Sequence, residues 1–144
     1  LSSDLVRDYV FDMDRMITFE GNTGPYLQYA HARICSILDK AGVDKAAFES
    51  TDLLLGEPAE RLLALQLLRY GDIVASASAH LEPHRVCTFL YELAETFNGF
   101  YQQCPVRQAE DEALRLSRLR LCDLARRVLA DGLGLLGIDA PVTM

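Results

Sequence analysis

The chain lacks a long uncharged apolar segment. Its longest stretch without Asp, Glu, Lys or Arg covers residues 21–32, which is 12 residues with several polar members. A membrane-spanning helix needs about 18 or more predominantly apolar residues. Residues 1–8 also lack the basic start and apolar run of a secretory signal. We therefore expect no membrane partner, and because position 1 is not Met we expect a piece of a longer chain.

An excess of positive charge is also missing. Fourteen Lys and Arg stand against 21 Asp and Glu, which gives a formal net charge of −7. A protein that coats nucleic acid through nonspecific phosphate contacts carries a basic surface, so this balance argues against coating and against a DNA-binding role. Residues 101–144 are balanced, with six acidic residues and six arginines. An anionic partner is therefore expected to dock near this second part.

Motifs for metal binding and redox chemistry are not present. The four cysteines lie more than four residues apart, so neither a Cys-x-x-Cys pair nor a zinc knuckle can be formed from neighbours in sequence; they are Cys35, Cys87, Cys104 and Cys122. His80 and His84 are four residues apart, but Pro83 between them breaks the helical geometry that a shared metal would need. We expect buried free thiols in a reducing cytosol and no metal site.

Catalytic signatures are absent as well. The sequence contains no Gly-x-Ser-x-Gly, no Walker loop and no His-Glu-x-x-His, and its three histidines have no evident nucleophile to serve. The acidic pair Asp111 and Glu112, with Arg115, is typical of a first helical turn, where carboxylates favour the helix dipole. No catalytic residue is assigned, and the chain alone is expected to be non-catalytic.

Helical periodicity dominates what the sequence does contain. No segment alternates with a period of two, so a chain of this length is expected to form one all-α bundle. Prolines and glycines bracket about five main helices. These are expected over residues 25–41, 58–70, 73–80 and 84–104, and from about 109 to a stop at Gly132, Gly134 or Gly137, with a short helical turn over 44–49.

The helix over residues 25–41 carries a distinctive side. At 100° per residue its core face is expected to consist of Leu27, Ala30, Ile34, Leu38 and Ala41. Tyr26, Tyr29 and Arg33 fall together beside that face. Two aromatic rings flanked by a bidentate donor suit an unstacked nucleotide base. The alternative, and the commoner arrangement on soluble helices, is a pair of core-edge tyrosines with a solvated arginine.

Residues 11–34 resemble the junction of the arginyl-tRNA synthetases, where the catalytic domain passes into the anticodon-binding domain. The resemblance continues through Glu82-Pro-His-Arg, Leu90-Tyr-Glu-Leu, Phe100-Tyr101, Cys104-Pro105, Glu112-Ala-Leu-Arg115 and Leu135-Leu-Gly-Ile138. Glu112-Ala-Leu-Arg115 is close to the Asp-Ala-Leu-Arg signature of the DALR family. The likeness covers essentially the whole chain. It implies a lead-in from a catalytic domain over residues 1–20 and a DALR-type anticodon-binding domain over 21–144.

This resemblance implies a helix bundle of the class Ia aminoacyl-tRNA synthetases, with arginine tRNA and the enzyme's own catalytic domain as partners. The full enzyme charges arginine tRNA with ATP and Mg²⁺. The His-Ile-Gly-His-like and Lys-Met-Ser-Lys-Ser-like signatures of its active site are absent, so no cofactor is expected in these residues. By resemblance the anticodon contacts are Tyr26, Tyr29, Arg33 and Met144. Tyr101 resembles a position near the anticodon stem, whereas Pro105 stands where some relatives carry an aromatic residue.

The genetic code suggests what this site would read. Every arginine anticodon has a central cytosine, whose O2 and N3 accept hydrogen bonds that a guanidinium such as Arg33 can donate. Ile138 and Val142 are expected to pin the tail beside the 25–41 helix and to bring Met144 alongside Tyr29. The alternative function is a helical protein-interaction module derived from the same domain, which would dock a partner through exposed Leu and Tyr side chains.

Overall fold

The structure is a computed structural model that describes residues 21–109 and 111–144. The lead-in expected over residues 1–20 lies outside the described residues. The described part contains helices and no strand, so the all-α prediction is confirmed. Its five main helices, with the short α3, are α2 (Gly24–Ala41), α3 (Lys45–Glu49), α4 (Pro58–Leu68), α5 (Tyr70–His80), α6 (His84–Gln103) and α7 (Glu112–Leu135). None of the described helices is both long and apolar enough to cross a bilayer.

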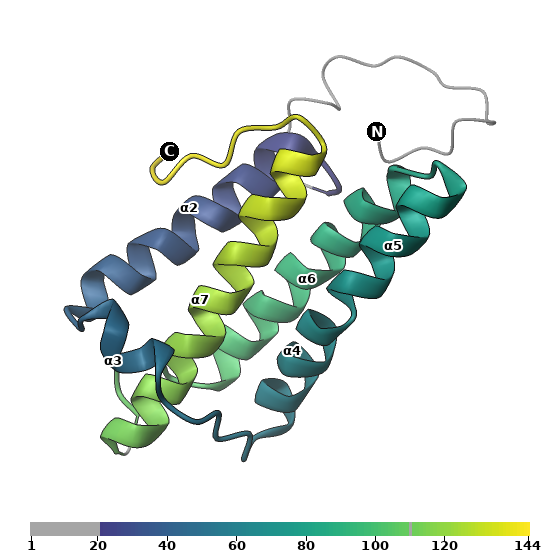
Figure 1. Ribbon diagram of the computed structural model, residues 1–144. Coiled ribbons are helices and arrows are strands. Elements are labelled where there is room, and N and C mark those ends of the chain that lie inside the picture. The colour runs from purple at the N-terminus through teal and green to yellow at the C-terminus, as the bar shows by residue number, and fades with distance from the viewer. Residues whose placement is uncertain (1–20, 110) are drawn as a thin grey trace.

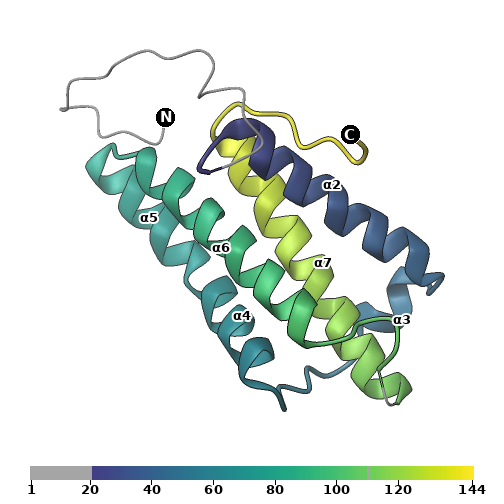
Figure 2. The ribbon, with the colours of Figure 1, turned by 180° about the vertical axis from the view of Figure 1, so that it is seen from behind.

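The two longest helices form the centre of the bundle (Figure 1). Helix α7 packs against α2, α3, α4 and α6, and α6 also packs against α2, α4 and α5. Helix α5 follows α4 in nearly the same direction, and the chain after α7 turns back to lie beside α2 (Figures 1 and 2). The anchors of the core are three phenylalanines of α6, Phe89, Phe97 and Phe100. Helix α2 packs on both central helices, α6 and α7.

The ends of α2 follow the local sequence. The Thr23 side chain accepts a hydrogen bond from the Tyr26 backbone N–H, and proline occupies the first turn. Gly42 ends the helix with φ of 64°, a left-handed conformation that favours glycine. The helical turn expected over 44–49 is α3, capped by the Asp44 side chain. The sequence therefore predicts this region correctly.

Two other boundaries differ from the expectation. The break between α4 and α5 lies at Arg69, so Gly71 is inside α5. Helix α7 begins at Glu112 rather than near residue 109, because the Asp111 side chain accepts a hydrogen bond from the Leu114 backbone N–H. The side chain of Asp111 thus sets the start of α7, whereas Arg69 has helical φ and ψ and caps α5 with no side-chain hydrogen bond.

The end of α7 depends on tertiary packing. The helix continues through Gly132 and Gly134 to Leu135, and the turn with positive φ comes at Gly137, where φ is 71°. Gly132 is buried against Leu90 of α6, and a Cβ there would lie 2.6 Å from Leu90 Cδ2. Gly132 thus permits the close approach of α6 and α7 and does not stop the helix.

An ion pair in the interior joins α4 to α7. Arg118 Nε donates to Glu60 Oε1 at 2.7 Å, and these side chains are 8% and 0% exposed. The second Glu60 oxygen accepts from the Glu57 backbone N–H at 2.9 Å, and Arg118 also donates to the Pro105 carbonyl. A buried charge pair is tolerated only when its remaining polar atoms are bonded, as they are here.

Candidate functional site

Helix α2 presents a core side and a polar side. Leu27, Ala30 and Ile34 are buried, and Leu38 and Ala41 are partly buried against the same core. The core face expected from the helical wheel is therefore confirmed. Tyr26 and Arg33 lie beside it and contact α6, and Tyr29, one turn from Tyr26, is exposed.

A chain of hydrogen bonds connects Arg33 with Tyr26 through α6. The Arg33 guanidinium donates to Asn98 Oδ1 at 3.1 Å, and Asn98 Nδ2 donates to the Tyr26 hydroxyl oxygen at 3.2 Å. The Tyr26 hydroxyl donates in turn to the Glu95 carboxylate. Every donor in this chain meets an acceptor, so the orientation of the Asn98 amide is fixed by its two partners. Arg33 and Tyr26 are thus held in one ordered network.

Tyr101 lies under the Arg33 side chain. The guanidinium carbon is 5.4 Å from the centroid of the Tyr101 ring, within the range of a cation–π contact. The Tyr101 ring stacks on Phe97, with centroids 6.1 Å apart and an interplanar angle of 19°. Because Phe97 is buried, this stack connects Arg33 to the core. The structure therefore joins Tyr101 to the tyrosine and arginine side of α2.

Tyr29 differs from Tyr26 in its surroundings. Its side chain is 50% exposed, whereas Tyr26 is half-buried with its ring 5.5 Å from that of Tyr91. Burial, followed by the hydrogen bond to Glu95, raises the pKa of the Tyr26 hydroxyl above its ordinary value. Tyr26 is therefore a protonated donor at neutral pH. Tyr29 offers an accessible aromatic face next to this network.

The C-terminal tail returns to α2, as expected, but one of its anchors differs. Ile138 packs against the core near Gly24. Val142, in contrast, is 65% exposed, so the expectation that it pins the tail is wrong. Residues 139–141 are held by hydrogen bonds from α2 side chains to the tail backbone. Met144 ends the tail with a 62% exposed side chain, and its placement alongside Tyr29 stays a prediction.

Two residues of this surface were missed by sequence reasoning, namely Glu95 and Asn98. With Tyr91 they repeat at spacings of four and three along α6, which puts all three on one side of the helix. This side borders the apolar period that identified the helix. The spacing could therefore have indicated a polar strip on α6. It could not have indicated which helix packs against that strip.

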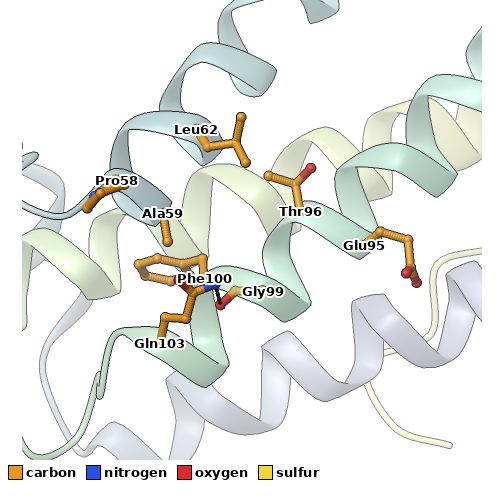
Figure 3. A pocket seen from close by; sticks show the side chains of 8 residues that line it. All are labelled: Pro58, Ala59, Leu62, Glu95, Thr96, Gly99, Phe100 and Gln103. Atoms are coloured by element: carbon orange, nitrogen blue, oxygen red, sulfur yellow. Dashed lines mark hydrogen bonds between the residues drawn. The ribbon is translucent and has the colours of Figure 1, made fainter.

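A shallow groove lies next to this surface, between α4 and α6 (Figure 3). Its volume is about 410 Å³, and it is lined by Pro58, Ala59, Leu62, Glu95, Thr96, Gly99, Phe100 and Gln103. The Gln103 amide donates to the Gly99 carbonyl within it. Glu95 lines one edge of the groove, and its carboxylate accepts the hydrogen bond from Tyr26.

The cysteines are free, and Cys87, Cys104 and Cys122 are buried while Cys35 is half-buried. Burial raises the pKa of each of these thiols. Among residues 21–109 and 111–144, no three His, Cys, Asp or Glu side chains are grouped as a metal site.

Comparison with known proteins identifies the family. Residues 27–144 match the model of the DALR anticodon binding domain. The chain is 56% identical over 144 residues to an arginine–tRNA ligase of Frankia casuarinae, of which it covers 24%, and 50% identical to that of Cutibacterium acnes, of which it covers 28%. It thus spans about a quarter of the length of these curated relatives.

Solved structures agree with this result. The arginyl-tRNA synthetase of Thermus thermophilus is 44% identical with a TM-score of 0.79, over 88% of this chain and 22% of that one. The arginyl-tRNA synthetase of Plasmodium falciparum is 29% identical with a TM-score of 0.87, over 99% of this chain and 25% of that one. The chain therefore belongs to the DALR anticodon-binding domain family.

Proposed function

We propose that this domain recognises the anticodon loop of arginine tRNA as part of an arginine–tRNA ligase. The observation that carries the proposal is the network in which Arg33, Asn98 and Tyr26 are hydrogen-bonded in sequence, with Tyr101 under the guanidinium. Unstacked RNA bases are recognised by aromatic faces together with hydrogen-bond donors aimed at base edges. The exposed ring of Tyr29 supplies such a face beside an oriented arginine.

Arg33 is suited to the central cytosine of an arginine anticodon. A guanidinium has five N–H donors, and among the described residues one of them is taken by Asn98. The remaining donors can reach the O2 and N3 acceptors of cytosine. Uracil would present an N3–H donor against them, and a polar site rejects a mismatched partner because its groups are then left unpaired. Base edges, rather than a basic surface, would give the specificity.

The roles of Tyr29 and Met144 complete the proposed site. Stacking of a base on Tyr29 would contribute about 1 to 3 kcal/mol. The flexible thioether of Met144 can pack on a base, and the chain end offers acceptors for the cytosine amine. Tyr101 would act through Arg33 and at the edge facing the anticodon stem. Two or three such contacts predict modest affinity for the isolated domain.

Aminoacylation itself is proposed for the complete ligase, which uses ATP and Mg²⁺. The described residues supply no grouped ligands for Mg²⁺, so we assign no step with either cofactor to them. The proposed role of this domain is to bind and orient the tRNA. We also propose a cytoplasmic location, which the four free cysteines support.

The deciding experiment compares two tRNA transcripts that differ only in the middle anticodon base, C or U. Arg33→Ala should lose about 1 to 3 kcal/mol of preference for C, because only the cytosine complex uses the guanidinium. Arg85→Ala is the charge-matched control, since Arg85 is exposed and about 20 Å from Asn98 along α6. Equal preference in Arg33→Ala and parent at matched salt would contradict the assignment.

A protein-interaction module remains the second candidate. It is favoured by Leu62, Leu65 and Leu68 on α4, which are exposed at three-residue spacing. The two functions use different helices, so variants separate them. Leu62→Ala with Leu65→Ala should leave tRNA binding unchanged if α2 and α6 form the RNA surface. Loss of tRNA binding in that double variant, with Arg33→Ala unaffected, would instead place the binding surface on α4.

A further inference from the structure

The C-terminal tail is held on α2 by two side chains that donate to its backbone. Gln28 Nε2 donates to the Asp139 carbonyl oxygen at 2.9 Å. His31 Nδ1 lies 2.8 Å from the Pro141 carbonyl oxygen. Both side chains come from the helix that also carries Tyr26, Tyr29 and Arg33. The proposed RNA surface and the end of the chain are therefore aligned by the same element.

The bond from His31 fixes the form of its ring. A carbonyl oxygen only accepts, so the proton must be on Nδ1. The Cys35 Sγ lies 3.7 Å from Nε2 and 3.9 Å from Nδ1, so it packs against the ring. Burial raises the pKa of the Cys35 thiol, which keeps the S–H available as a weak donor. His31 is 2% exposed, so its ring meets the Pro141 carbonyl oxygen inside the protein.

The spacing of these bonds sets where the tail ends. From Gln28 to His31 and from Asp139 to Pro141, helix and tail run in the same direction. Met144 is three residues beyond Pro141 and hence within about 10 Å of it. Arg33 is two residues beyond His31 on the helix, a rise of about 3 Å. The tail therefore runs towards the level of Arg33 along the axis of α2, on another side of the helix, because two residues turn the helix by about 200°.

The last residues have little anchoring of their own. Val142 and Met144 are mostly exposed, and Ile138, which packs on the core, lies six residues before the end. Chain ends held so weakly are normally disordered. Residues 139–141, between Ile138 and the free end, are held by the packing of Ala140 on the core and by the two hydrogen bonds from α2.

We propose that Gln28 and His31 are positioning residues, which clamp the backbone of the tail at Asp139 and Pro141 and thereby hold Met144 at the anticodon-binding surface. This inference rests on the proposed function, in which Met144 contacts the anticodon. Neither side chain needs to touch RNA itself. Helix α2 then performs three tasks on three sides: it packs on the core, presents Tyr26, Tyr29 and Arg33, and holds the tail.

The first measurement is the order of the tail without RNA, by ¹⁵N relaxation of Val142, Thr143 and Met144. Gln28→Ala and His31→Ala should each make these amides more mobile on the nanosecond timescale. His31→Asn should restore the order, because an asparagine amide nitrogen can occupy nearly the place of Nδ1. Gln102→Ala, an exposed glutamine on α6, is the control. Unchanged order in both alanine variants would overturn the clamp.

The second measurement is binding of arginine tRNA by variants combined with deletion of Met144. His31→Ala should weaken binding about fivefold or more, and the Met144 deletion should do the same. Adding His31→Ala to the deletion should cost nothing further, because both changes remove one contact. Should His31→Ala fail to fold, Gln28→Ala gives the same comparison.

The outcomes separate the two proposals. If Met144 deletion weakens binding while Gln28→Ala and His31→Ala do not, the clamp is wrong and the proposed function stands. If the losses from His31→Ala and the deletion add fully, His31 acts by another route and the clamp is again overturned. If the parent shows no preference for arginine tRNA, the proposed function fails, and the proposed role of the clamp in presenting Met144 fails with it, even where the relaxation data show that the tail is held.

Discussion

The Arg33 guanidinium lies over the ring of Tyr101, with 5.4 Å between its central carbon and the ring centroid. The two residues belong to α2 and α6, and Tyr101 is itself stacked on the buried Phe97. An exposed arginine usually samples many rotamers, and ordering it on binding costs free energy. The contacts with Tyr101 and Asn98 restrict Arg33 before any ligand arrives. The guanidinium proposed to read the anticodon is therefore already oriented.

Tyr29 tests stacking separately from hydrogen bonding. Tyr29→Ala should lower the affinity for arginine tRNA by about 1 to 3 kcal/mol, because it removes an exposed aromatic face. Tyr29→Phe should retain most of the affinity, since stacking does not require the hydroxyl. Fluorescence anisotropy with labelled tRNA measures both. Thermal unfolding should change little in either variant, and a fall in affinity for Tyr29→Phe equal to that for Tyr29→Ala would argue against stacking.

The two raised tyrosine pKa values predict alkaline instability. Burial, then a hydrogen bond to a carboxylate, raises the pKa of Tyr26 beside Glu95 and of Tyr70 beside Asp131. In the unfolded chain both hydroxyls ionise near pH 10. Their contribution to stability is therefore full below about pH 10 and is lost as the pH rises towards the higher folded-state values.

Melting temperatures measured from about pH 9 to 11 check this expectation. The parent should lose more stability over this range than a double variant carrying Tyr26→Phe and Tyr70→Phe, because phenylalanine does not ionise. The remaining tyrosines are common to both proteins and cancel in the comparison. Identical slopes for parent and variant would show that these two hydroxyls do not control the alkaline transition.

Gly132 and Gly134 form a matched pair within α7. Gly132→Ala should destabilise the fold by about 1 to 3 kcal/mol, because its Cβ would lie 2.6 Å from a methyl of the fully buried Leu90. Gly134→Ala meets no atom within 4 Å and should stabilise by up to about 1 kcal/mol through helix propensity. Urea unfolding distinguishes them. Equal effects of both substitutions would show that α6 and α7 can move apart at little cost.

Breaking the buried Glu60–Arg118 pair should lower the free energy of unfolding more than breaking an exposed ion pair. Glu60→Ala or Arg118→Ala leaves the other charge buried and should cost about 3 to 5 kcal/mol of the free energy of unfolding. Lys45→Ala breaks the exposed pair with Glu49 and should cost less than about 0.5 kcal/mol. A double Glu60 and Arg118 variant that loses the sum of the two single costs would indicate that the charges act independently.

The local sequence determined the helices and the faces of α2. Caps such as Thr23 and Gly42 act within one helical turn, so their effect can be read without knowing the fold. The wheel placed Leu27, Ala30 and Ile34 in the core and Tyr26, Tyr29 and Arg33 beside it because both sets depend on periodicity alone. The family resemblance, carried by motifs along the chain, was also available from sequence, and the family match confirms it.

Tertiary structure decided which partners those side chains meet. Nothing in the local pattern of α6 says that Asn98 faces Arg33, or that Tyr101 lies beneath it, because these contacts depend on how two helices cross. The same reason applies to Gly132, which looked like a helix stop until Leu90 was found to occupy its side-chain space. The contacts of the tail were also decided by tertiary structure. The sequence suggested Val142 as an apolar anchor, whereas hydrogen bonds from Gln28 and His31 hold the tail backbone. Only the folded bundle brings residues 139–141 to α2.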